Sequence, residues 1–171
     1  MQRIILHLDL DYFYAQVEET QNPNIKDKPI VVCQYSGRTD DSGAVATTNY
    51  IARKFNVKSG LPIKTAKNLL QNTDSVFIPA NHELYESISE TIMNIIRKYS
   101  DKFEQLSIDE ACIDISNKIN NDYQDAIKYG NTLQDEIKNA KIHSVGRILS
   151  PNLSNVFFRS EISQNYWPHN E

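Results

Sequence analysis

The sequence has few of the residues and segments that mark secreted, disulfide-linked or membrane-spanning proteins. It contains 2 cysteines, Cys33 and Cys112, whose spacing suits no metal site. Both fall inside predicted strands, so we expect buried, reduced side chains of a cytoplasmic protein. No apolar run approaches the roughly 20 residues that span a bilayer, and the first residues do not predict a signal peptide.

Positive charge is also scarce. The chain has 18 lysines and arginines against 22 acidic residues, which gives a net charge of −4. Proteins that hold duplex DNA on their own are usually basic, because phosphate contacts supply most of the affinity. The charge balance therefore argues against tight duplex binding by this chain alone. The 171 residues, 40% hydrophobic and 23% charged, are otherwise ordinary for a globular protein with one sizeable core or two small lobes.

The most informative stretch covers residues 4–18. Residues 4–10 are almost continuously apolar, which predicts a strand buried on both faces, and a helical pattern starts at Tyr12. A carboxylate at the end of a buried strand is costly unless something pairs with it, and a bound cation is a common solution. We therefore assign Asp9 to a metal ion. Asp11 directly precedes the helix and is assigned to its N-cap.

A second acidic site lies in the segment Ser107-Ile108-Asp109-Glu110-Ala111. The apolar runs on either side, residues 103–106 and 111–115, predict neighbouring antiparallel strands. Two adjacent acids in an apolar hairpin repel each other and lose hydration, which sheets tolerate mainly at a cation site or a solvated tip. Together with Asp9 they offer three carboxylates, a set suited to Mg²⁺, which favours carboxylates plus substrate phosphates.

Three ordered stretches resemble the motifs of one family. They are residues 8–18 (LDLDYFYAQVE), residues 107–111 (SIDEA), and a middle stretch with Ser36-Gly37-Arg38, Ser42 to Thr47 (SGAVAT), Tyr50 and Arg53-Lys54. In this order they resemble the Y-family, translesion DNA polymerases, and are most similar to the archaeal DNA polymerase IV branch. The resemblance runs from about residue 3 to about residue 146.

The order of predicted elements favours an α+β fold with helices on one face of an antiparallel sheet. Further predicted elements are strands at 30–34 and 44–48, and helices at 50–55, 63–70, 81–99 and 122–139. The resemblance implies that this sheet is a polymerase palm, formed by residues 1–20 and 80–146. It also implies a small inserted fingers lobe, residues 21–79.

The resemblance implies a two-metal site. Asp9, Asp109 and Glu110, helped by the backbone carbonyl of Leu10, would hold two Mg²⁺ ions, with Mn²⁺ able to substitute. One ion would activate the primer 3′-hydroxyl and the other would clamp the triphosphate. The reaction would be an in-line phosphoryl transfer that depends on positioning and charge neutralisation.

The resemblance also implies a nucleotide site. Tyr50 and Arg53 are three positions apart and share a helix face, and both would reach the triphosphate. Tyr14 resembles the steric gate that excludes a ribose 2′-hydroxyl, and Phe13 would meet the triphosphate through its backbone N–H.

Small residues complete the expected site. Ala44, Ala46 and Gly60 resemble the residues that form a roof over the nascent base pair. Their size would leave room for damaged bases, which is the basis for expecting lesion bypass.

The sequence departs from the family after residue 146. Members continue with a segment that supplies a triphosphate-binding lysine, but no lysine follows Lys141 here, and Arg159 is a poor substitute. We expect residues 147–171 to be a divergent C-terminal tail, with the thumb and the DNA-binding C-terminal domain absent. A truncated or frame-disrupted gene product would have this pattern.

The expected function is therefore the catalytic part of a translesion polymerase that is weak or inactive by itself. Its expected partners are a dNTP and primer–template DNA, the latter bound weakly, with a second chain that supplies the missing domains as an open possibility. The alternative is a non-catalytic nucleotide- or metal-binding remnant, or a regulatory module. A nucleotidyl cyclase is disfavoured because the sequence has no Gly-Gly-(Asp/Glu)-Glu-Phe signature.

Overall fold

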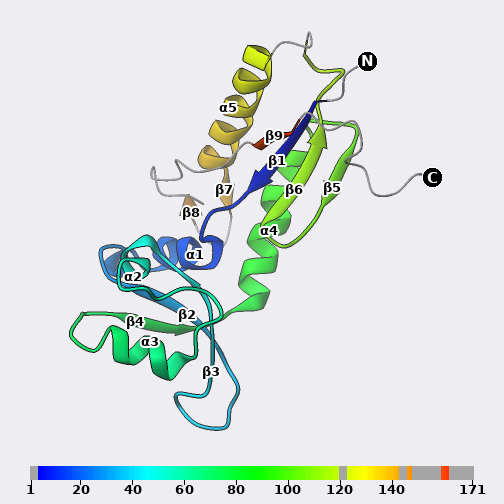
Figure 1. The fold of residues 1–171 in the computed structure, drawn as a ribbon. Helices are drawn as coiled ribbons and strands as arrows, with labels where there is room; N and C mark the ends of the chain where they lie inside the picture. The colour runs from blue at the N-terminus through cyan, green and yellow to red at the C-terminus, as the bar shows by residue number, and fades with distance from the viewer. Residues whose placement is uncertain (1–3, 120–122, 143–145, 148–158, 162–171) are drawn as a thin grey trace. The chain divides into compact units, whose positions relative to one another are not determined.

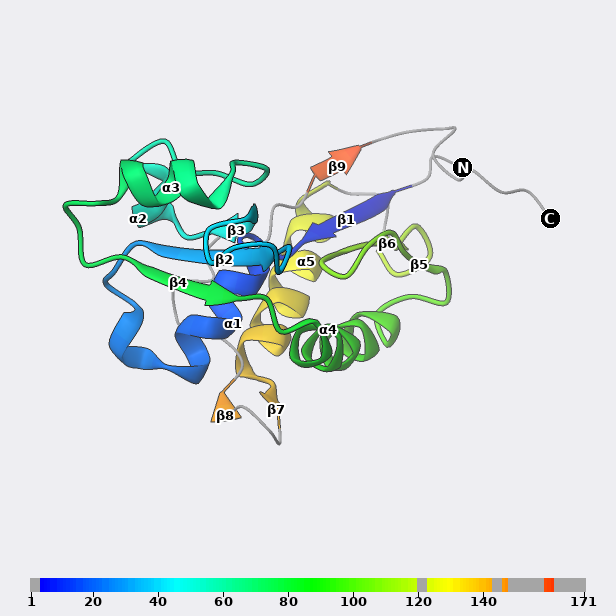
Figure 2. The same cartoon turned by 90° about the horizontal axis from the view of Figure 1, so that it is seen from below.

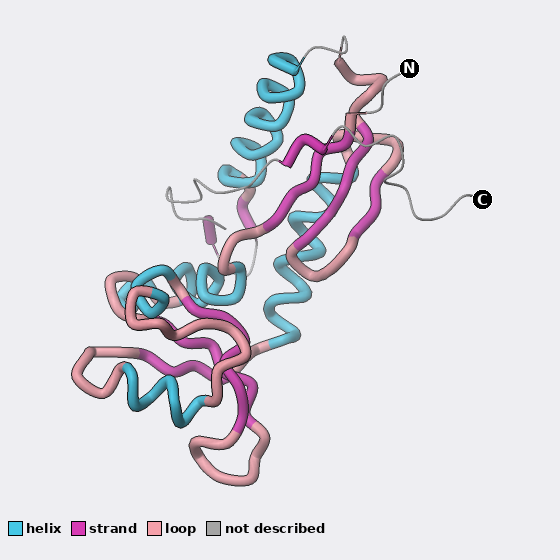
Figure 3. Tube along the Cα trace, in the orientation of Figure 1, coloured by secondary structure: helices cyan, strands magenta, loops and turns pink. Residues whose placement is uncertain are grey.

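The computed structural model describes residues 4–119, 123–142, 146–147 and 159–161 (Figure 1). The chain forms two compact units, one of residues 1–11 with 86–171 and the other of residues 12–85. Both units combine strands and helices, which confirms the predicted α+β class (Figure 3). The division into palm, fingers and tail stays a prediction.

The first unit contains a four-stranded antiparallel sheet in the order β5-β6-β1-β9 (Figure 1). Its strands are β1 (Ile5–Asp9), β5 (Phe103–Gln105), β6 (Glu110–Asp114) and β9 (Arg159–Glu161). The predicted hairpin is confirmed as β5 and β6. Strand β9 lies in the part of the sequence expected to diverge, and its backbone pairs with residues 5–7 of β1.

Two helices cover one face of this sheet (Figures 1 and 2). They are α5 (Tyr123–Asn139) and the portion of α4 (His82–Arg97) that starts at residue 86. The helix predicted at 81–99 is confirmed as α4, and its residues Ile88, Ile92, Ile95 and Ile96 are buried. A short hairpin of β7 (Lys141–Ile142) and β8 (Gly146–Arg147) follows α5.

The second unit is built on a three-stranded sheet in the order β3-β2-β4. Its strands are β2 (Ile30–Tyr35), β3 (Gly43–Thr48) and β4 (Val76–Pro79), and its helices are α1 (Phe13–Gln21), the 3₁₀ turn η1 (Pro23–Ile25), α2 (Tyr50–Arg53) and α3 (Ile63–Leu69). Strand β3 runs antiparallel to β2, and β4 runs parallel to it. Strand β4 was not predicted from the sequence.

The start of α1 differs from the prediction. The N-cap residue is Tyr12, not Asp11, with φ of 37° and ψ of 39°, and the N-cap side chain makes no capping hydrogen bond to α1. A capping side chain needs an extended N-cap backbone, but here the chain enters the helix through a left-handed residue. The predicted N-cap role of Asp11 is therefore wrong. A left-handed non-glycine residue costs of order 1–3 kcal/mol.

The two cysteines behave as predicted. Cys33 in β2 and Cys112 in β6 are buried, and within the described residues both are free of disulfides. Burial raises the pKa of the Cys33 thiol to about 11, which keeps it protonated at neutral pH. None of the helices that the structure describes has the length and apolar character needed to cross a bilayer.

Candidate functional site

The first unit brings the three predicted acids together at one end of its sheet. Asp9 is the last residue of β1, and Glu110, directly across from it in the antiparallel register, is the first residue of β6. Asp109 precedes Glu110 in the turn between β5 and β6. The juxtaposition inferred from two separate apolar patterns is thus produced by one strand pairing.

Backbone hydrogen bonds hold the turn that carries Asp109 and Glu110. The amides of Leu106 and Ser107 both donate to the carbonyl of Glu110, at 3.0 and 3.3 Å. The amide of Leu10 donates to the carbonyl of Asp109 at 2.9 Å and so ties the end of β1 to the turn. The backbone of Asp109 and Glu110 is therefore hydrogen-bonded both to β1 and within the turn.

Ser107 orients the side chain of Asp109. Its hydroxyl donates to Asp109 Oδ1 at 2.6 Å and accepts from the Asp109 amide at 3.2 Å. No role was predicted for Ser107, although its place two residues before an acid in a turn is typical of such local side-chain bonds.

The electrostatics of the cluster favour a cation. Burial raises the pKa of Asp9, and the nearby charges of Asp109 and Glu110 raise it further. The proximity of the Glu110 side chain, directly across from Asp9 in the strand register, adds to the rise in the Asp9 pKa. A divalent ion bound between these carboxylates would offset their mutual repulsion. In donor chemistry the three carboxylates fit Mg²⁺ or Mn²⁺.

The side chains of Asp9, Asp109 and Glu110 are not pre-arranged to coordinate a metal ion. Among the residues that the structure describes, no three or more His, Cys, Asp and Glu side chains are arranged as a ready-made metal site. The Asp109 carboxylate accepts a hydrogen bond from the Ser107 hydroxyl. Binding a cation at all three acids would therefore require their carboxylates to rearrange, with Asp109 exchanging its hydrogen bond from Ser107 for a metal contact.

The second unit places Tyr50 and Arg53 together on α2. The Arg53 guanidinium carbon lies 4.9 Å from the centre of the Tyr50 ring, and the Tyr12 ring meets Tyr50 edge-on with 5.3 Å between centroids. Both α2 residues are exposed, Tyr50 to 42%. A cation and a phenol on one exposed helix face are suited to binding phosphate oxygens.

Asn49, a residue that the sequence patterns did not single out, fixes the start of α2. This side chain is 2% exposed. Its Oδ1 accepts from the amides of Ile30 and Ala52 at 3.0 and 3.1 Å. Its Nδ2 donates to the carbonyl of Lys28 at 2.8 Å and to Glu19 Oε1 at 3.2 Å. One amide thus caps α2 and joins it to β2 and α1.

Tyr14 and Phe13 occupy different environments. Phe13 is 3% exposed and belongs to the core, whereas Tyr14 is partly exposed. The Tyr14 ring stacks on Tyr85 and meets the His82 ring edge-on, with centroids 6.1 Å apart. The hydroxyl of Tyr85 donates to Glu18 Oε1 at 2.6 Å. Of the two aromatic residues, only Tyr14 has a ring that a ligand could reach.

The three small residues also lie together. Ala44 and Ala46 flank buried Val45 in β3, so their side chains point to the opposite, more exposed face of the strand. The amide of Gly60 donates to the carbonyl of Val45 at 2.9 Å, which lays residues 59–62 beside β3. Gly60 has a φ of +84°, a conformation that favours glycine.

Comparison with known proteins decides the family. The profile of the impB/mucB/samB family matches residues 8–146, a range that includes every residue of the predicted site. The chain belongs to the impB/mucB/samB family.

Curated relatives of this impB/mucB/samB member are DNA polymerases. The chain is 54% identical over 134 residues to DNA polymerase IV of Saccharolobus solfataricus, covering 78% of this chain and 37% of that protein. It is 50% identical over 149 residues to DNA polymerase IV of Sulfurisphaera tokodaii, covering 87% and 42%. The chain thus spans about two-fifths of the length of the curated relatives it matches.

Solved structures of Y-family polymerases have the same fold. A Y-family chimera of Dbh and Dpo4 gives a TM-score of 0.76 at 43% identity, with 84% of this chain and 40% of that one covered. An insertion ternary complex of Dbh DNA polymerase gives 0.73 at 46% identity, with 78% and 38% covered. The resemblance to Y-family polymerases inferred from the sequence is confirmed.

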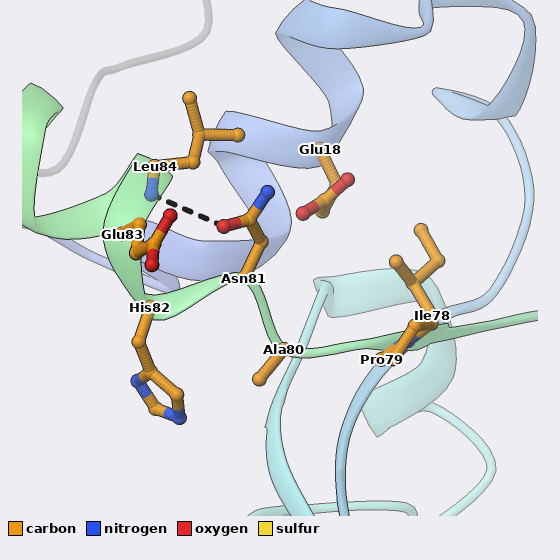
Figure 4. A pocket seen from close by; sticks show the side chains of 8 residues that line it. All are labelled: Glu18, Ile78, Pro79, Ala80, Asn81, His82, Glu83 and Leu84. Carbon is orange, nitrogen blue, oxygen red and sulfur yellow. Dashed lines mark hydrogen bonds between the residues drawn. The ribbon is translucent and has the colours of Figure 1, made fainter.

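A pocket of about 530 Å³ lies where β4 leads into α4 in this impB/mucB/samB member (Figure 4). Residues 78–84 and Glu18 line it. Of these lining residues, Leu84 donates its amide to Asn81 Oδ1 at 3.2 Å, which caps α4. His82 Nε2 is bonded to Gln34 Oε1, outside the lining, at 2.8 Å. None of the predicted site residues lines this pocket.

The sequence predicts that the family's triphosphate-binding lysine is missing from the segment after residue 146. Most of that segment, 148–158 and 162–171, lies outside the described residues. Of Arg159 the structure gives the backbone, which pairs with His7 in β1.

Proposed function

We propose that this chain forms the palm and fingers of a Y-family translesion DNA polymerase. In this proposal residues 1–20 and 80–146 are the palm, residues 21–79 are the fingers, and residues 147–171 are a divergent tail. The observation that carries it is the pairing of β1 with β6, which brings Asp9, Asp109 and Glu110 to one end of the sheet. The reaction would transfer dNMP from a dNTP to a primer 3′-hydroxyl under the direction of a template.

Asp9, Asp109, Glu110 and the backbone carbonyl of Leu10 would hold two Mg²⁺ ions, with Mn²⁺ as a substitute. When bound, such ions lower the pKa of the attacking hydroxyl and neutralise the triphosphate. The protein's own contribution is to keep three mutually repelling carboxylates close together on paired strands. The hydrogen bonds that Leu10 and Ser107 donate to Asp109 keep that residue in place.

Tyr50 and Arg53 would bind the triphosphate, together with the backbone N–H of Phe13. Tyr14 would act as the steric gate against a 2′-hydroxyl. Its ring is supported from behind by the buried Tyr85, so it cannot retreat without disturbing the core. Ala44, Ala46 and Gly60 would form the small-residue roof over the nascent base pair.

The proposed partners are a dNTP and primer–template DNA, in a cytoplasmic setting. A net charge of −4 leaves little to offset repulsion by the phosphate backbone. We therefore propose weak DNA binding by this chain alone, strengthened when a second chain supplies further domains. Nucleotide and metal binding without turnover is the alternative, supported by the end of the family match at residue 146.

Single-turnover primer extension by the full chain at high protein and low salt tests the proposal. Low salt and high protein concentration raise the fraction of DNA that is bound, so weak DNA binding does not limit the rate. We expect slow, Mg²⁺-dependent extension that Asp109→Asn abolishes, with Glu90→Gln, an exposed acid on α4, as a control that keeps it. Binding of dNTP and metal without extension would favour the alternative. If Asp109→Asn keeps both metal binding and extension, the proposed metal site is wrong.

A further inference from the structure

The turn that carries the acids is also held from α4. Ser89 lies inside this helix and is 2% exposed. Its hydroxyl donates to the backbone carbonyl of Ile108 at 2.5 Å. A serine within a helix usually faces water or bonds back to the carbonyl four residues earlier. Ser89 instead uses its hydroxyl on a different element, and the acceptor is the residue next to Asp109.

The position of this acceptor matters for Asp109. The carbonyl of Ile108 and the amide of Asp109 belong to one peptide plane. Ser89 binds the carbonyl side of that plane, and the hydroxyl of Ser107 binds the amide side. The next plane is fixed where the carbonyl of Asp109 accepts from Leu10. Both planes that flank the Asp109 Cα are therefore held, and so is the direction of its Cα–Cβ bond.

We propose that Ser89 is a positioning residue for the acidic turn, one that fixes the backbone at Asp109 so that its carboxylate can join Asp9 and Glu110 in binding a divalent cation. The inference rests on the proposed function, since it takes these acids as the cation ligands. Mutual repulsion of three carboxylates would otherwise spread the turn from β1. A bond from a helix packed on the sheet resists that movement at the point where Asp109 leaves the strand.

The expected effect is on cation affinity. Loss of a group that orients a metal ligand typically costs about 10-fold or more in affinity. Ser89→Ala removes the hydroxyl and improves helix propensity, so helix stability does not predict the loss. Ser87→Ala is the matched control, because Ser87 is an exposed serine on the same helix.

The test is a Mn²⁺ titration of the full chain, followed by the electron paramagnetic resonance signal of free Mn²⁺, with thermal melting recorded for every variant. We expect Ser89→Ala to weaken Mn²⁺ binding about 10-fold, Ser87→Ala to leave it unchanged, and Ser89→Thr, which keeps a hydroxyl, to recover affinity. Equal affinities for Ser89→Ala and Ser87→Ala would overturn the inference, and so would failure of Ser89→Thr to exceed Ser89→Ala.

Two further variants keep the test decisive. If Ser89→Ala does not fold, Ser89→Cys takes its place, because it preserves the side-chain volume but has only a weak S–H donor; wild-type affinity in that variant would overturn the inference. Asp109→Asn distinguishes failure of the proposed metal site from failure of the proposed role of Ser89. If the wild type and Asp109→Asn bind Mn²⁺ equally, the proposed metal site is wrong and the role of Ser89 falls with it. If only Asp109→Asn loses affinity, the site stands and Ser89 does not position it.

Discussion

The Tyr14 ring lies stacked on the Tyr85 ring, with centroids 4.2 Å apart and an interplanar angle of 15°. Tyr85 is fully buried, and its hydroxyl donates to Glu18. Burial and that hydrogen bond raise the pKa of Tyr85, so the phenol stays protonated as a donor. The stack gives Tyr14 a fixed backing in the second unit, as a steric gate requires.

The first prediction concerns sugar selection. In an assembly that extends primers, Tyr14→Ala should raise ribonucleotide incorporation relative to deoxyribonucleotide by about 10-fold or more, because it removes the ring that would meet the 2′-hydroxyl. Tyr14→Phe keeps the ring and should keep the selection. The ratio of kcat/KM for a matched rNTP and dNTP measures this effect, and an unchanged ratio in Tyr14→Ala would remove Tyr14 from the gate role.

A second prediction concerns Asn49. Asn49→Ala leaves the amides of Ile30 and Ala52 without their acceptor and should lower the free energy of unfolding by about 2–4 kcal/mol. Urea denaturation followed by circular dichroism measures the change. Asn72→Ala, at an exposed position, should have almost no effect. Equal stabilities of the two variants would show that the four-bond network around Asn49 does not hold the second unit together.

The third prediction is a pH dependence at Glu19. Burial raises the pKa of this carboxyl above its ordinary value of 4.5, against the opposing effect of the Asn49 amide. The folded state then binds the Glu19 proton more tightly than the unfolded state, so the free energy of unfolding falls as pH rises from 4.5 through the folded pKa. Glu19→Gln removes the free-energy cost of ionising this buried carboxyl and should be more stable than wild type at pH 7.

The advantage of Glu19→Gln should vanish below pH 4.5, where wild-type Glu19 is protonated in both states. Urea denaturation of both proteins at pH 4 and pH 7 measures it. Glu86→Gln, at an exposed position on α4, should show no comparable difference. A stability difference for Glu19→Gln that is the same at both pH values would contradict the assignment of the cost to ionisation.

The sequence predicted those parts of the structure that rest on repeated local patterns. The apolar runs of β1 and β6 each extend over several positions, so both strands were identified and the acids at their ends could be placed together. The pairing of Tyr50 with Arg53 followed from helical spacing in the same way.

The parts that the sequence did not predict depend on single contacts between distant residues. Asn49 and Ser89 are lone polar residues whose partners, Ile30 and Ile108, lie elsewhere in the chain and leave no periodic signal. Strand β4 has four residues and ends in a proline, which weakens a strand pattern. The Asp11 cap failed because a left-handed Tyr12, disfavoured for a tyrosine, carries the chain into α1.

Thermal melting of the full chain with and without Mn²⁺ tests most directly the central claim, that Asp9, Asp109 and Glu110 form a divalent-cation site. A ligand at 100 times its dissociation constant adds about 2.7 kcal/mol, which corresponds to a rise of roughly 5 °C or more in Tm for a protein of this size. We predict that rise for the wild type and for Glu90→Gln. Asp109→Asn, which can still accept the hydrogen bond from Ser107, should show almost none. A Mn²⁺-induced rise of equal size in Asp109→Asn would contradict the account.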